Sequence, residues 1–454
     1  MKKKFLTTLL AGVLTISAFG LAGCADSAYD IAVKNGFTGT EQEWLQSLQG
    51  ADGKDAPKLT VHDVYEEAVA SGEFIGTFSE FLESYLALSV PENNDVEILA
   101  KNVLSTVSIY TGFEKSETGL LGQVVSKEVY CTAGSGVIVD LDREHGNATV
   151  ITNYHVVYDS GATTENGISE EIWLYLYGAV NAFNTKTGKD ENGDGIKARF
   201  VGGSMDYDIA VLEIQGSKIL KESLAEEATF GDSNNATVGE KVHVVGNPQG
   251  HGMAVSEGVL SVDSEYIGMK SLDGANRTVS YRVMRTDAAV NGGNSGGPLF
   301  NSRGELIAIV NAKSIADGVE NVGYALPAAQ VQGVMENVKN NNGNVSRATL
   351  GVSVIIADTT VSMKADGTLL LTEKIQIDSV TKNSAAYGKL LAGDVMKTMI
   401  LDGVSYPLNR RFYVNDLLLK VQKGDTVSWM IERNGKEMKV EITFNKDYMF
   451  TAVQ

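Results

Sequence analysis

Short apolar runs recur at close intervals between about residue 100 and residue 335, and they constrain the fold more than any other feature of the sequence. The runs are rich in Val, Ile and Tyr and are separated by Gly, Asn and Asp. They read VSIYTGF, GSGVIVDL, ATVITNYHVV, EIWLYLYGAV, IKARFVGG, DIAVLEI, KVHVVGNP, YRVMRTD and LIAIVNA. This spacing predicts β-strands joined by turns, and it favours an all-β domain of barrels or sandwiches over alternating β-α-β units.

The residues after this region predict a helix, a linker and a second β-rich module. PAAQVQGVMENVKN begins at Pro327, and proline is common in the first turn of a helix. The polar stretch NNNGNVSRA that follows is typical of a linker. Residues 349–454 contain further strand-like runs, and the Asn-Gly pair of ERNGKE predicts a tight hairpin between the last two. We therefore expect one domain over residues 96–340 and another over residues 345–454.

The N-terminus predicts export from the cytoplasm. Three lysines at positions 2 to 4 precede an apolar stretch from Phe5 to Ala22, which is the arrangement of a signal peptide. The stretch is nearly long enough to span a membrane, so a transmembrane anchor is the alternative. LAGC, at Leu21–Cys24, resembles the lipobox of bacterial lipoproteins, in which the cysteine is acylated. We therefore expect a signal peptide over residues 1–23 and a lipid on Cys24 that holds the protein at the extracytoplasmic face of the cell membrane.

Residues 24–95 contain two copies of a short unit. Residues 28–48 and residues 64–86 share Tyr, Val, Gly, Gly, Thr, an aromatic residue and Leu in the same order, with one insertion. Each copy predicts a helix that stops at a glycine, followed by a short helix with a threonine N-cap. The unit resembles repeats near the membrane-proximal ends of surface proteins of Gram-positive bacteria. We expect a small helical stalk or spacer, and a binding role stays open.

The acidic charge of the chain excludes nucleic acid as a partner. The formal net charge is −19, from 57 Asp and Glu against 38 Lys and Arg, and no basic patch is visible in the sequence. We expect neither a cofactor nor a bound metal. The one cysteine besides Cys24 is Cys131, which we interpret as a small hydrophobic residue near a strand. If Cys24 carries a lipid, no intramolecular disulfide can form.

One serine, Ser295, lies in the glycine-rich stretch NGGNSGGPL. A serine becomes a nucleophile only with a general base within hydrogen-bond reach and a carboxylate that orients the base. Among the five histidines, His155 follows an apolar strand-like run at the point where a loop begins, which suits a catalytic side chain. The others lie in the N-terminal repeats, in polar turns or within a strand-like run: His62, His145, His243 and His251.

Asp208 is the candidate for the orienting carboxylate, because it directly precedes the apolar run IAVLEI. An aspartate there is more often a simple turn residue. The order His155, Asp208, Ser295 is nevertheless the chymotrypsin-like order. An α/β-hydrolase would need a helix after the serine, whereas Pro298 and an apolar strand-like segment follow it here.

The glycines around Ser295 suit an oxyanion hole. Backbone N–H groups can converge on a negatively charged oxygen only where the chain turns tightly and no Cβ blocks the approach. The N–H groups of Gly293 and Ser295 are the natural pair, with that of Asn294 nearby.

Six motifs in chain order resemble those of the HtrA (DegP-like) serine proteases. They are GSGVIV (134–139), TNYHVV (152–157), DIAVL (208–212), GNPQG (246–250), TDAAVNGGNSGGPLFNSRGELIAIVNA (286–312) and GYALP (323–327). The segments ATLGVSV and VTKNSAAYGKLLAGDVM resemble the PDZ domain that follows the protease in this family. The resemblance implies a mainly β protein, with a chymotrypsin-like double β-barrel over residues 96–340 and a PDZ domain over residues 345–454.

The resemblance also implies roles for individual residues. His155 would act as general base and then general acid, Asp208 would orient it, and Ser295 would attack the scissile carbonyl. The specificity (S1) pocket would be formed by the segment after the nucleophile, namely Ile309, Val310, Asn311 and Ala312. These side chains are apolar or small, so we expect cleavage after small or medium aliphatic residues. The loop that receives a peptide carboxylate in the PDZ domain would be Leu350, Gly351 and Val352.

The sequence therefore predicts a membrane-anchored, extracytoplasmic serine endopeptidase. Its substrates would be unfolded or exposed polypeptides, in protein quality control, and its PDZ domain would bind C-terminal peptides. The family favours homotrimers, although the N-terminal stalk replaces the segment that often supports them. The alternative is a surface-anchored peptide-binding scaffold or chaperone whose protease fold is idle.

Two features depart from the family pattern. Gly292 stands where the family usually has proline, which gives the loop before Ser295 extra freedom. An insertion, NAFNTKTGKDENGDG at residues 181–195, precedes the run that ends near Asp208. Asp190, Asn192 and Asp194 have the spacing of a calcium loop, but the twelfth position is Val201 where such a loop has Glu. A polar hairpin tip is the default interpretation, and calcium binding is the alternative.

Overall fold

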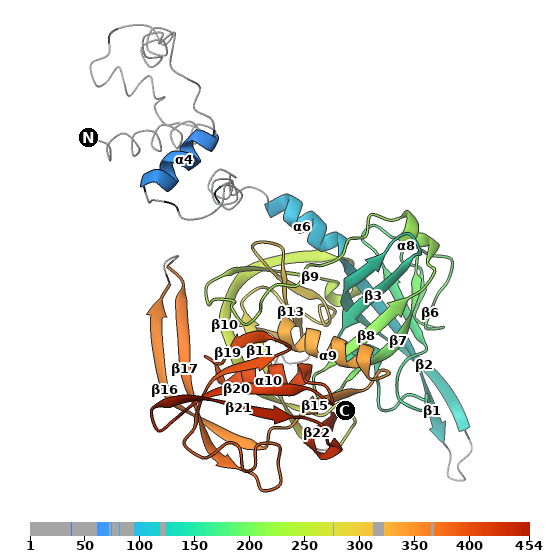
Figure 1. The fold of residues 1–454 in the computed structure, drawn as a ribbon. Coiled ribbons are helices and arrows are strands. Elements are labelled where there is room, and N and C mark those ends of the chain that lie inside the picture. The colour runs from blue at the N-terminus through green and yellow to red at the C-terminus, as the bar shows by residue number, and fades with distance from the viewer. Residues whose placement is uncertain are drawn as a thin grey trace. The chain divides into compact units, whose positions relative to one another are not determined.

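The computed structural model describes residues 38, 61–71, 74, 81, 95–118, 124–275, 277–311, 322–364 and 367–454. The chain divides into two compact units, Met1–Pro91 and Glu92–Gln454 (Figure 1). The described residues form a mainly β fold, which confirms the fold class predicted from the recurring apolar runs. No helix within the described ranges is long and apolar enough to cross a membrane.

The first unit contains one described helix, α4 (Val61–Ser71), in the second of the two predicted repeats. The aromatic rings of Tyr65, Phe74 and Phe81 pack on one another, with centroids 5.3–6.2 Å apart. The predicted signal peptide, Cys24 and the first repeat lie outside the described residues.

The second unit begins with helix α6 (Asp95–Leu104), which leads into a closed six-stranded barrel in the order β1-β2-β3-β8-β7-β4. Its strands are β1 (Thr106–Thr118), β2 (Val124–Asp142), β3 (Asn147–Thr152), β4 (Glu171–Tyr175), β7 (Ile196–Ser204) and β8 (Ile209–Ile214). In β4, Ile172 and Leu174 are buried while Glu171 and Trp173 are half-buried. This period of two lets β4 turn Ile172 and Leu174 into the barrel.

Two short helices and a hairpin follow strands of the first barrel. Helices α7 (Tyr154–Val157) and α8 (Lys218–Glu222) follow β3 and β8. The insertion forms a hairpin of β5 (Phe183–Asn184) and β6 (Lys189–Asp190) between β4 and β7. The polar hairpin expected from its sequence is therefore present.

The second barrel is also closed, in the order β10-β11-β14-β13-β12-β9. Its elements are β9 (Lys241–Gly246), the 3-10 turn η1 (Pro248–Gly250), β10 (Ala254–Lys270), β11 (Thr278–Thr286), β12 (Pro298–Asn301), β13 (Leu306–Val310) and β14 (Gly323–Pro327). All five residues of β13 are buried, because helix α9 (Ala328–Asn340) packs against the barrel there. The helix begins directly after Pro327, as the sequence predicts.

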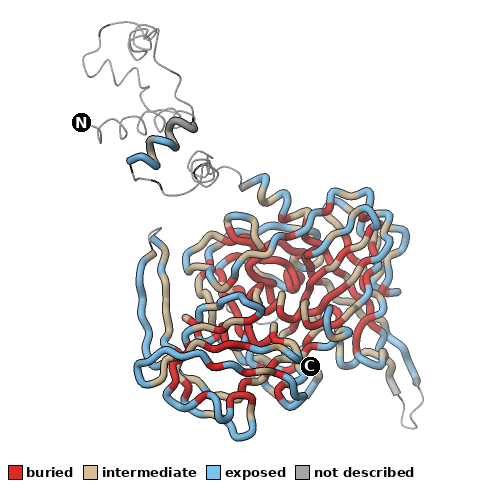
Figure 2. The backbone as a smooth tube through the Cα atoms, viewed as in Figure 1, coloured by how far each residue is buried: buried red, intermediate tan, exposed pale blue. Residues whose placement is uncertain are grey.

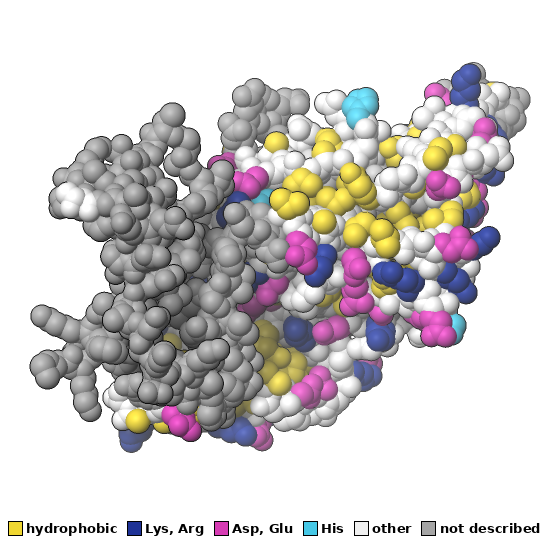
Figure 3. Space-filling view, turned by 90° about the horizontal axis from the view of Figure 1, so that it is seen from above, with side chains coloured by type: hydrophobic (Ala, Val, Ile, Leu, Met, Phe, Trp, Pro, Cys, Tyr) yellow, Lys and Arg dark blue, Asp and Glu magenta, His cyan; other side chains and the backbone are white. Residues whose placement is uncertain are grey.

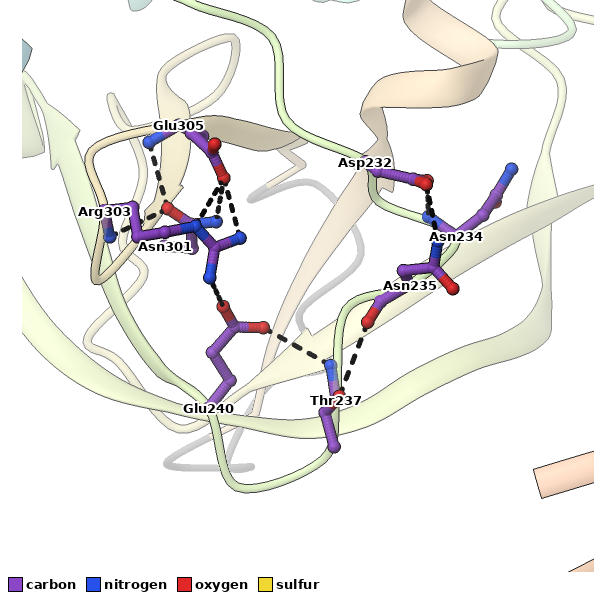
Figure 4. Close-up of polar contacts among 8 residues, drawn as sticks. All are labelled: Asp232, Asn234, Asn235, Thr237, Glu240, Asn301, Arg303 and Glu305. Atoms are coloured by element: carbon purple, nitrogen blue, oxygen red, sulfur yellow. Dashed lines mark hydrogen bonds and ion pairs between the residues drawn. The ribbon is translucent and has the colours of Figure 1, made fainter. Parts of the chain in front are cut away.

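Polar side chains close the β12–β13 hairpin of the second barrel (Figure 4). Asn301 Oδ1 accepts hydrogen bonds from the backbone N–H groups of Arg303 and Glu305, both at 3.0 Å. The Arg303 guanidinium binds Glu305 at 2.7 Å and lies 3.8 Å from Glu240, which precedes β9. These contacts tie the hairpin to the neighbouring loop.

The C-terminal module is a five-strand path in the order β16-β17-β18-β20-β21, with β19 paired to β18. Its elements are β16 (Val352–Met363), β17 (Leu369–Val380), β18 (Val395–Leu401), β19 (Val404–Pro407), α10 (Arg411–Lys420), β20 (Thr426–Arg433), β21 (Lys436–Thr443) and the 3-10 turn η3 (Asp447–Met449). The linker strand β15 (Val345–Ala348) pairs with the last strand, β22 (Phe450–Val453). Asn434 and Gly435 both have positive φ, 54° and 75°, as the predicted tight hairpin requires.

The second barrel and the C-terminal module share a buried polar contact. Asp416 of α10 accepts hydrogen bonds from Arg282 of β11 and from Gln330 of α9, the latter at 3.2 Å. The Arg282 guanidinium also lies over the ring of Phe412, 3.5 Å from its centroid. Buried residues fill the interiors of the barrels and of the C-terminal module (Figure 2).

Charged side chains of both signs are interspersed over the face seen in Figure 3, where Lys and Arg do not gather into one basic patch.

Candidate active site

Two neighbouring strands of the first barrel bring His155 and Asp208 together. Strands β3 and β8 are antiparallel, and Thr152 near the end of β3 pairs with Ala210 near the start of β8. His155 follows β3 in helix α7, and Asp208 directly precedes β8. The two residues, 53 positions apart in sequence, therefore lie at the same edge of the barrel.

A continuous chain of hydrogen bonds joins these residues to Ser295 of the second barrel. Asp208 Oδ2 lies 2.7 Å from His155 Nδ1, and His155 Nε2 lies 3.0 Å from Ser295 Oγ. Asp208 Oδ1 also accepts the backbone N–H of His155 at 2.9 Å. This arrangement can pass the hydroxyl proton of Ser295 to the imidazole while the carboxylate holds the ring in one tautomer.

The Asp208 carboxylate is buried, and both of its oxygen atoms have hydrogen-bond partners. Its side chain is 1% exposed, against 18% for His155. Asn311 Nδ2 donates to Asp208 Oδ2 at 2.9 Å, and Asn153 Nδ2 donates to the backbone carbonyl of Asp208 at 3.0 Å. Asp208 has a φ of +52°, a left-handed conformation that aspartate tolerates better than most residues. These contacts fix the carboxylate in one orientation.

Backbone contacts explain the glycines around Ser295. Gly293 has a φ of +97°, and a Cβ there would lie 2.2 Å from the carbonyl oxygen of Asn247. Gly296 has a φ of +82°, and a Cβ there would lie 2.1 Å from Thr152 Oγ1. A larger residue at either position would displace the turn that presents Ser295.

Two N–H groups in this turn are available to an oxyanion, and a third is not. Among the described residues, neither the Gly293 N–H nor the Ser295 N–H donates to a protein acceptor. The Asn294 N–H donates to the carbonyl of Asn291 at 3.0 Å. Including Asn294 among the oxyanion donors was therefore wrong, because its N–H is already used to close the turn.

Ser135 is a residue of the site that the sequence interpretation missed. Its N–H donates to the Ser295 carbonyl at 2.8 Å, and its hydroxyl donates to the Gly293 carbonyl at 2.8 Å. The hydroxyl also accepts the Asn247 N–H at 2.8 Å. Ser135 thus fastens the turn of the second barrel to strand β2 of the first. Its place between two glycines in the first matched motif was the available signal.

Three of the four residues predicted to line the S1 pocket are buried: Ile309, Val310 and Asn311. Ile309 and Val310 are fully buried in β13, and the Asn311 side chain binds Asp208. Ala312 lies outside the described residues. The specificity pocket at residues 309–312 stays a prediction.

The three residues predicted to bind a peptide carboxylate line one groove of about 490 Å³. Leu350 is buried, Gly351 has a φ of +77°, and Val352 begins β16, which is the edge strand of its sheet. Val414 and Leu418 of α10 also line the groove. Arg347, Arg411 and Tyr266 also border the groove.

The described residues contain no group of three or more His, Cys, Asp or Glu side chains placed to hold a metal ion. In the insertion, Asp190 accepts hydrogen bonds from the Tyr175 hydroxyl at 2.6 Å and from the Gly193 N–H at 3.0 Å. Asp194 accepts the Val180 N–H at 2.8 Å. These carboxylates close the turns of the hairpin.

Cys131 is a free thiol whose pKa is raised by burial.

Two closed β-barrels with hydrogen-bonded His, Asp and Ser side chains between them define a trypsin-like serine peptidase, and residues 134–309 match the trypsin-like peptidase domain family. The chain is 30% identical over 359 residues to the serine protease Do-like HtrA of Bacillus subtilis (strain 168), covering 77% of this chain and 72% of that protein. It is 30% identical over 390 residues to the protein of the same name from Lactococcus lactis subsp. cremoris (strain MG1363), and the alignment covers 79% of this chain and 84% of that protein. The chain therefore belongs to the HtrA (Do-like) family and is a serine endopeptidase.

A solved structure, the HtrA-type protease AlgW with decapeptide, is also similar to the chain. It is 24% identical, with a TM-score of 0.45, and the alignment covers 78% of this chain and 98% of that one.

Proposed function

We propose that Ser295 is the nucleophile of this endopeptidase, His155 its general base and acid, and Asp208 the residue that orients His155. The observation that carries the proposal is the unbroken series of contacts from Asp208 to His155 to Ser295, at 2.7 and 3.0 Å. These are the distances at which a base can take the proton of a nucleophile.

The reaction follows from this geometry. Ser295 Oγ forms a bond to the carbonyl carbon of the substrate while its proton moves to His155 Nε2. The carbonyl oxygen becomes negatively charged, and the N–H groups of Gly293 and Ser295 stabilise it. His155 then gives its proton to the leaving amine as the C–N bond breaks. Water then attacks the acyl carbon while His155 takes its proton, the bond from that carbon to Ser295 Oγ breaks, and His155 returns the proton to Oγ.

The test is labelling with a fluorophosphonate probe, together with casein hydrolysis. Wild type and a control variant at an exposed serine, Ser160→Ala, should react with the probe and digest casein. Ser295→Ala should do neither. Equal activity of wild type and Ser295→Ala would overturn the assignment of the nucleophile. An inert wild type would favour the idle scaffold or chaperone.

We also propose that residues 345–454 are a PDZ domain that binds the C-terminus of a peptide. The edge strand β16 can pair with an extended peptide, and the groove beside it is lined by aliphatic side chains. Arg347 and Arg411 at the groove favour a negatively charged end group. A peptide with a free apolar C-terminus should bind the full chain, and the same peptide with a C-terminal amide should bind much more weakly. Equal affinity would contradict the proposal.

The proposed setting is the extracytoplasmic face of the cell membrane, with Cys24 as the lipid anchor and unfolded or exposed polypeptides as substrates in quality control. The support is the N-terminal sequence and the names of relatives such as "Probable periplasmic serine endoprotease DegP-like" of Halomonas elongata, 29% identical over 317 residues. A homotrimer is proposed from the family alone. The test is fractionation: wild type should sediment with membranes and Cys24→Ser should not. Membrane association of both would overturn the lipid anchor.

A further inference from the structure

The inserted hairpin of residues 181–195 contacts the first barrel beside Tyr110 of β1. The ring of Phe183 lies against that of Tyr110, with centroids 5.3 Å apart, and Tyr175 meets the Tyr110 ring edge-on at 5.5 Å. The hairpin backbone also lies on the strand: a Cβ at Gly112 would be 2.4 Å from the carbonyl oxygen of Gly188. The insertion therefore covers one side of Tyr110.

The Tyr110 hydroxyl reaches across to the second barrel. It donates to the carbonyl of Gly250 at 2.9 Å and accepts from Asn247 Nδ2 at 3.1 Å. Gly250 ends the η1 turn, and Asn247, which is fully buried, caps its start. The Asn247 side chain is held from its other end, where Oδ1 accepts the Gly252 N–H at 2.9 Å. One hydroxyl group thus fixes the η1 turn at two points.

The η1 turn in turn contacts the loop before Ser295. The Gln249 N–H donates to the Gly292 carbonyl at 2.7 Å, and Gln249 has a φ of +55°. A left-handed conformation at a glutamine is uncommon and needs surrounding contacts to hold it. The Asn247 carbonyl occupies the space where a side chain at Gly293 would lie.

This contact determines the direction of one oxyanion donor. A trans peptide is planar, and its C=O and N–H point in opposite directions. Because the Gly292 carbonyl points at Gln249, the Gly293 N–H of the same peptide points away from the η1 turn and stays free for an oxyanion. A reversed peptide would lose the bond to Gln249 and remove this donor.

We propose that Tyr110 is a positioning residue that keeps the Gly292–Gly293 peptide in the orientation needed for catalysis, and that the 181–195 hairpin supports it through Phe183. The inference rests on the proposed role of Ser295 and its oxyanion hole. It assigns to the insertion a function in the activity of the enzyme rather than in calcium binding. Gly292 increases the need for such a support, because it replaces the proline usual in the family.

The decisive variant is Tyr110→Phe, which keeps the ring and removes both hydroxyl contacts. Deleting a donor outright costs on the order of 10²–10³ in kcat, so a misoriented donor should lower kcat by about tenfold to a hundredfold. The KM for a peptide substrate should change by less than about twofold, because the donor acts on the transition state. A peptide aldehyde, whose adduct carries the oxyanion, should lose affinity in parallel with kcat. Tyr177→Phe, at an exposed tyrosine of the same barrel, is the matched control.

A second variant guards against a general folding defect. Phe183→Leu changes a half-buried side chain outside the barrel and should show the same pattern more weakly, with unchanged thermal unfolding. Unaltered kcat and aldehyde affinity in Tyr110→Phe would overturn the inference, as would losses in kcat and KM that only track the melting temperature. Fluorophosphonate labelling of wild type but not of Ser295→Ala tests the underlying function separately, so the two failures can be told apart.

Discussion

Two buried carboxylates in this chain each face a basic side chain, and they do different work. Asp208 pairs with His155 between the barrels, and Asp416 pairs with Arg282 between the second barrel and α10. Their residues are 1% and 3% exposed. Burial and charge alone would not distinguish the two pairs.

The two pairs differ in the partners of the remaining nitrogen atoms of the basic side chain. The His155 ring has a second nitrogen, directed at the Ser295 hydroxyl, and 18% of its side chain is exposed. The Arg282 side chain is fully buried, and its Nε and Nη2 donate to Ser264 and Asn234 at 3.0 and 3.1 Å. A pair whose basic ring also contacts a hydroxyl and is partly exposed can move a proton, whereas a fully buried pair with all its donors used can only hold two parts of the chain together.

Asp208→Asn should have the largest effect on activity and a small one on stability. The amide keeps the shape of the carboxylate but favours the wrong histidine tautomer, which costs about 10⁴-fold in kcat in a triad of this kind. Peptide hydrolysis at saturating substrate gives kcat, and calorimetry gives the melting temperature. The control is Asp378→Asn, at an exposed aspartate of β17. A loss of less than about tenfold would mean that Asp208 does not orient His155.

Asp416→Ala should show the reverse, a large loss of stability with kcat retained in the folded fraction. Burial raises the pKa of Asp416 and lowers that of Arg282, so each charge depends on the other. Removing one partner of such a pair leaves the other charge uncompensated and costs about 3–5 kcal/mol. Denaturant unfolding measures this cost.

A double replacement tests whether the stability of the Arg282–Asp416 contact requires the two charges. Arg282→Met combined with Asp416→Leu removes both charges, and such replacements are often neutral or stabilising by about 1–4 kcal/mol. The double variant should therefore recover most of the stability lost by Asp416→Ala. A double variant as unstable as the single one would show that the ion pair itself is needed.

The sequence was sufficient to predict that His155, Asp208 and Ser295 meet at one site, and insufficient to predict the contacts that hold them there. His155, Asp208 and Ser295 could be found because the chemistry limits the residue types and their order along the chain. Ser135 was missed: its place between two glycines was a signal, but its role depends on contacts with backbone groups more than a hundred positions away. Asn294 was misassigned because a sequence does not show which N–H groups a turn has already used.

Contacts between domains are equally hard to predict from the sequence. The recurring apolar runs predicted strands in barrels or sandwiches, since their spacing and turn residues report structure along the chain. Arg282 and Asp416 are 134 residues apart, and nothing in either local pattern indicates that the two meet. Asn311 was predicted only as a pocket residue, and the sequence did not indicate that its amide also binds Asp208, which depends on how β13 lies against the first barrel.

Gly292→Ala should have a smaller effect and should favour catalysis. Gly292 lies outside the left-handed region, and a Cβ there meets no atom within 4 Å. Alanine would restrict the loop without strain, a change worth about 0.4–1 kcal/mol at compatible sites. Fluorophosphonate labelling should accelerate by about two- to fivefold, because a free energy of about 1.4 kcal/mol corresponds to a factor of ten. Gly293→Ala is the opposite control, because its φ of +97° and the nearby Asn247 carbonyl forbid a side chain. Slower labelling of Gly292→Ala would contradict the expectation.

The smallest predicted effect is a pH dependence of stability at the β12–β13 hairpin. The hydrogen bond from Arg303, followed by that from Asn301, lowers the pKa of Glu305 below its ordinary value. A carboxylate whose pKa is lowered on folding stabilises the protein above its unfolded pKa of about 4.3, and this contribution is lost as the pH falls through the folded pKa. Glu240 also faces Arg303 and shares its charge, so the contribution of a single exposed pair stays within about 0.2–1 kcal/mol.

Glu305→Gln should therefore melt at a lower temperature than wild type at pH 7, and the two proteins should converge as the pH falls below about 4. Thermal unfolding at both pH values measures the difference. A gap that persists at low pH would mean that Glu305 stabilises the hairpin through its neutral contacts with Asn301 rather than through its charge. Either way, kcat should be unchanged at pH 7, because these contacts close a hairpin of the second barrel and touch neither Ser295 nor the turn that presents it.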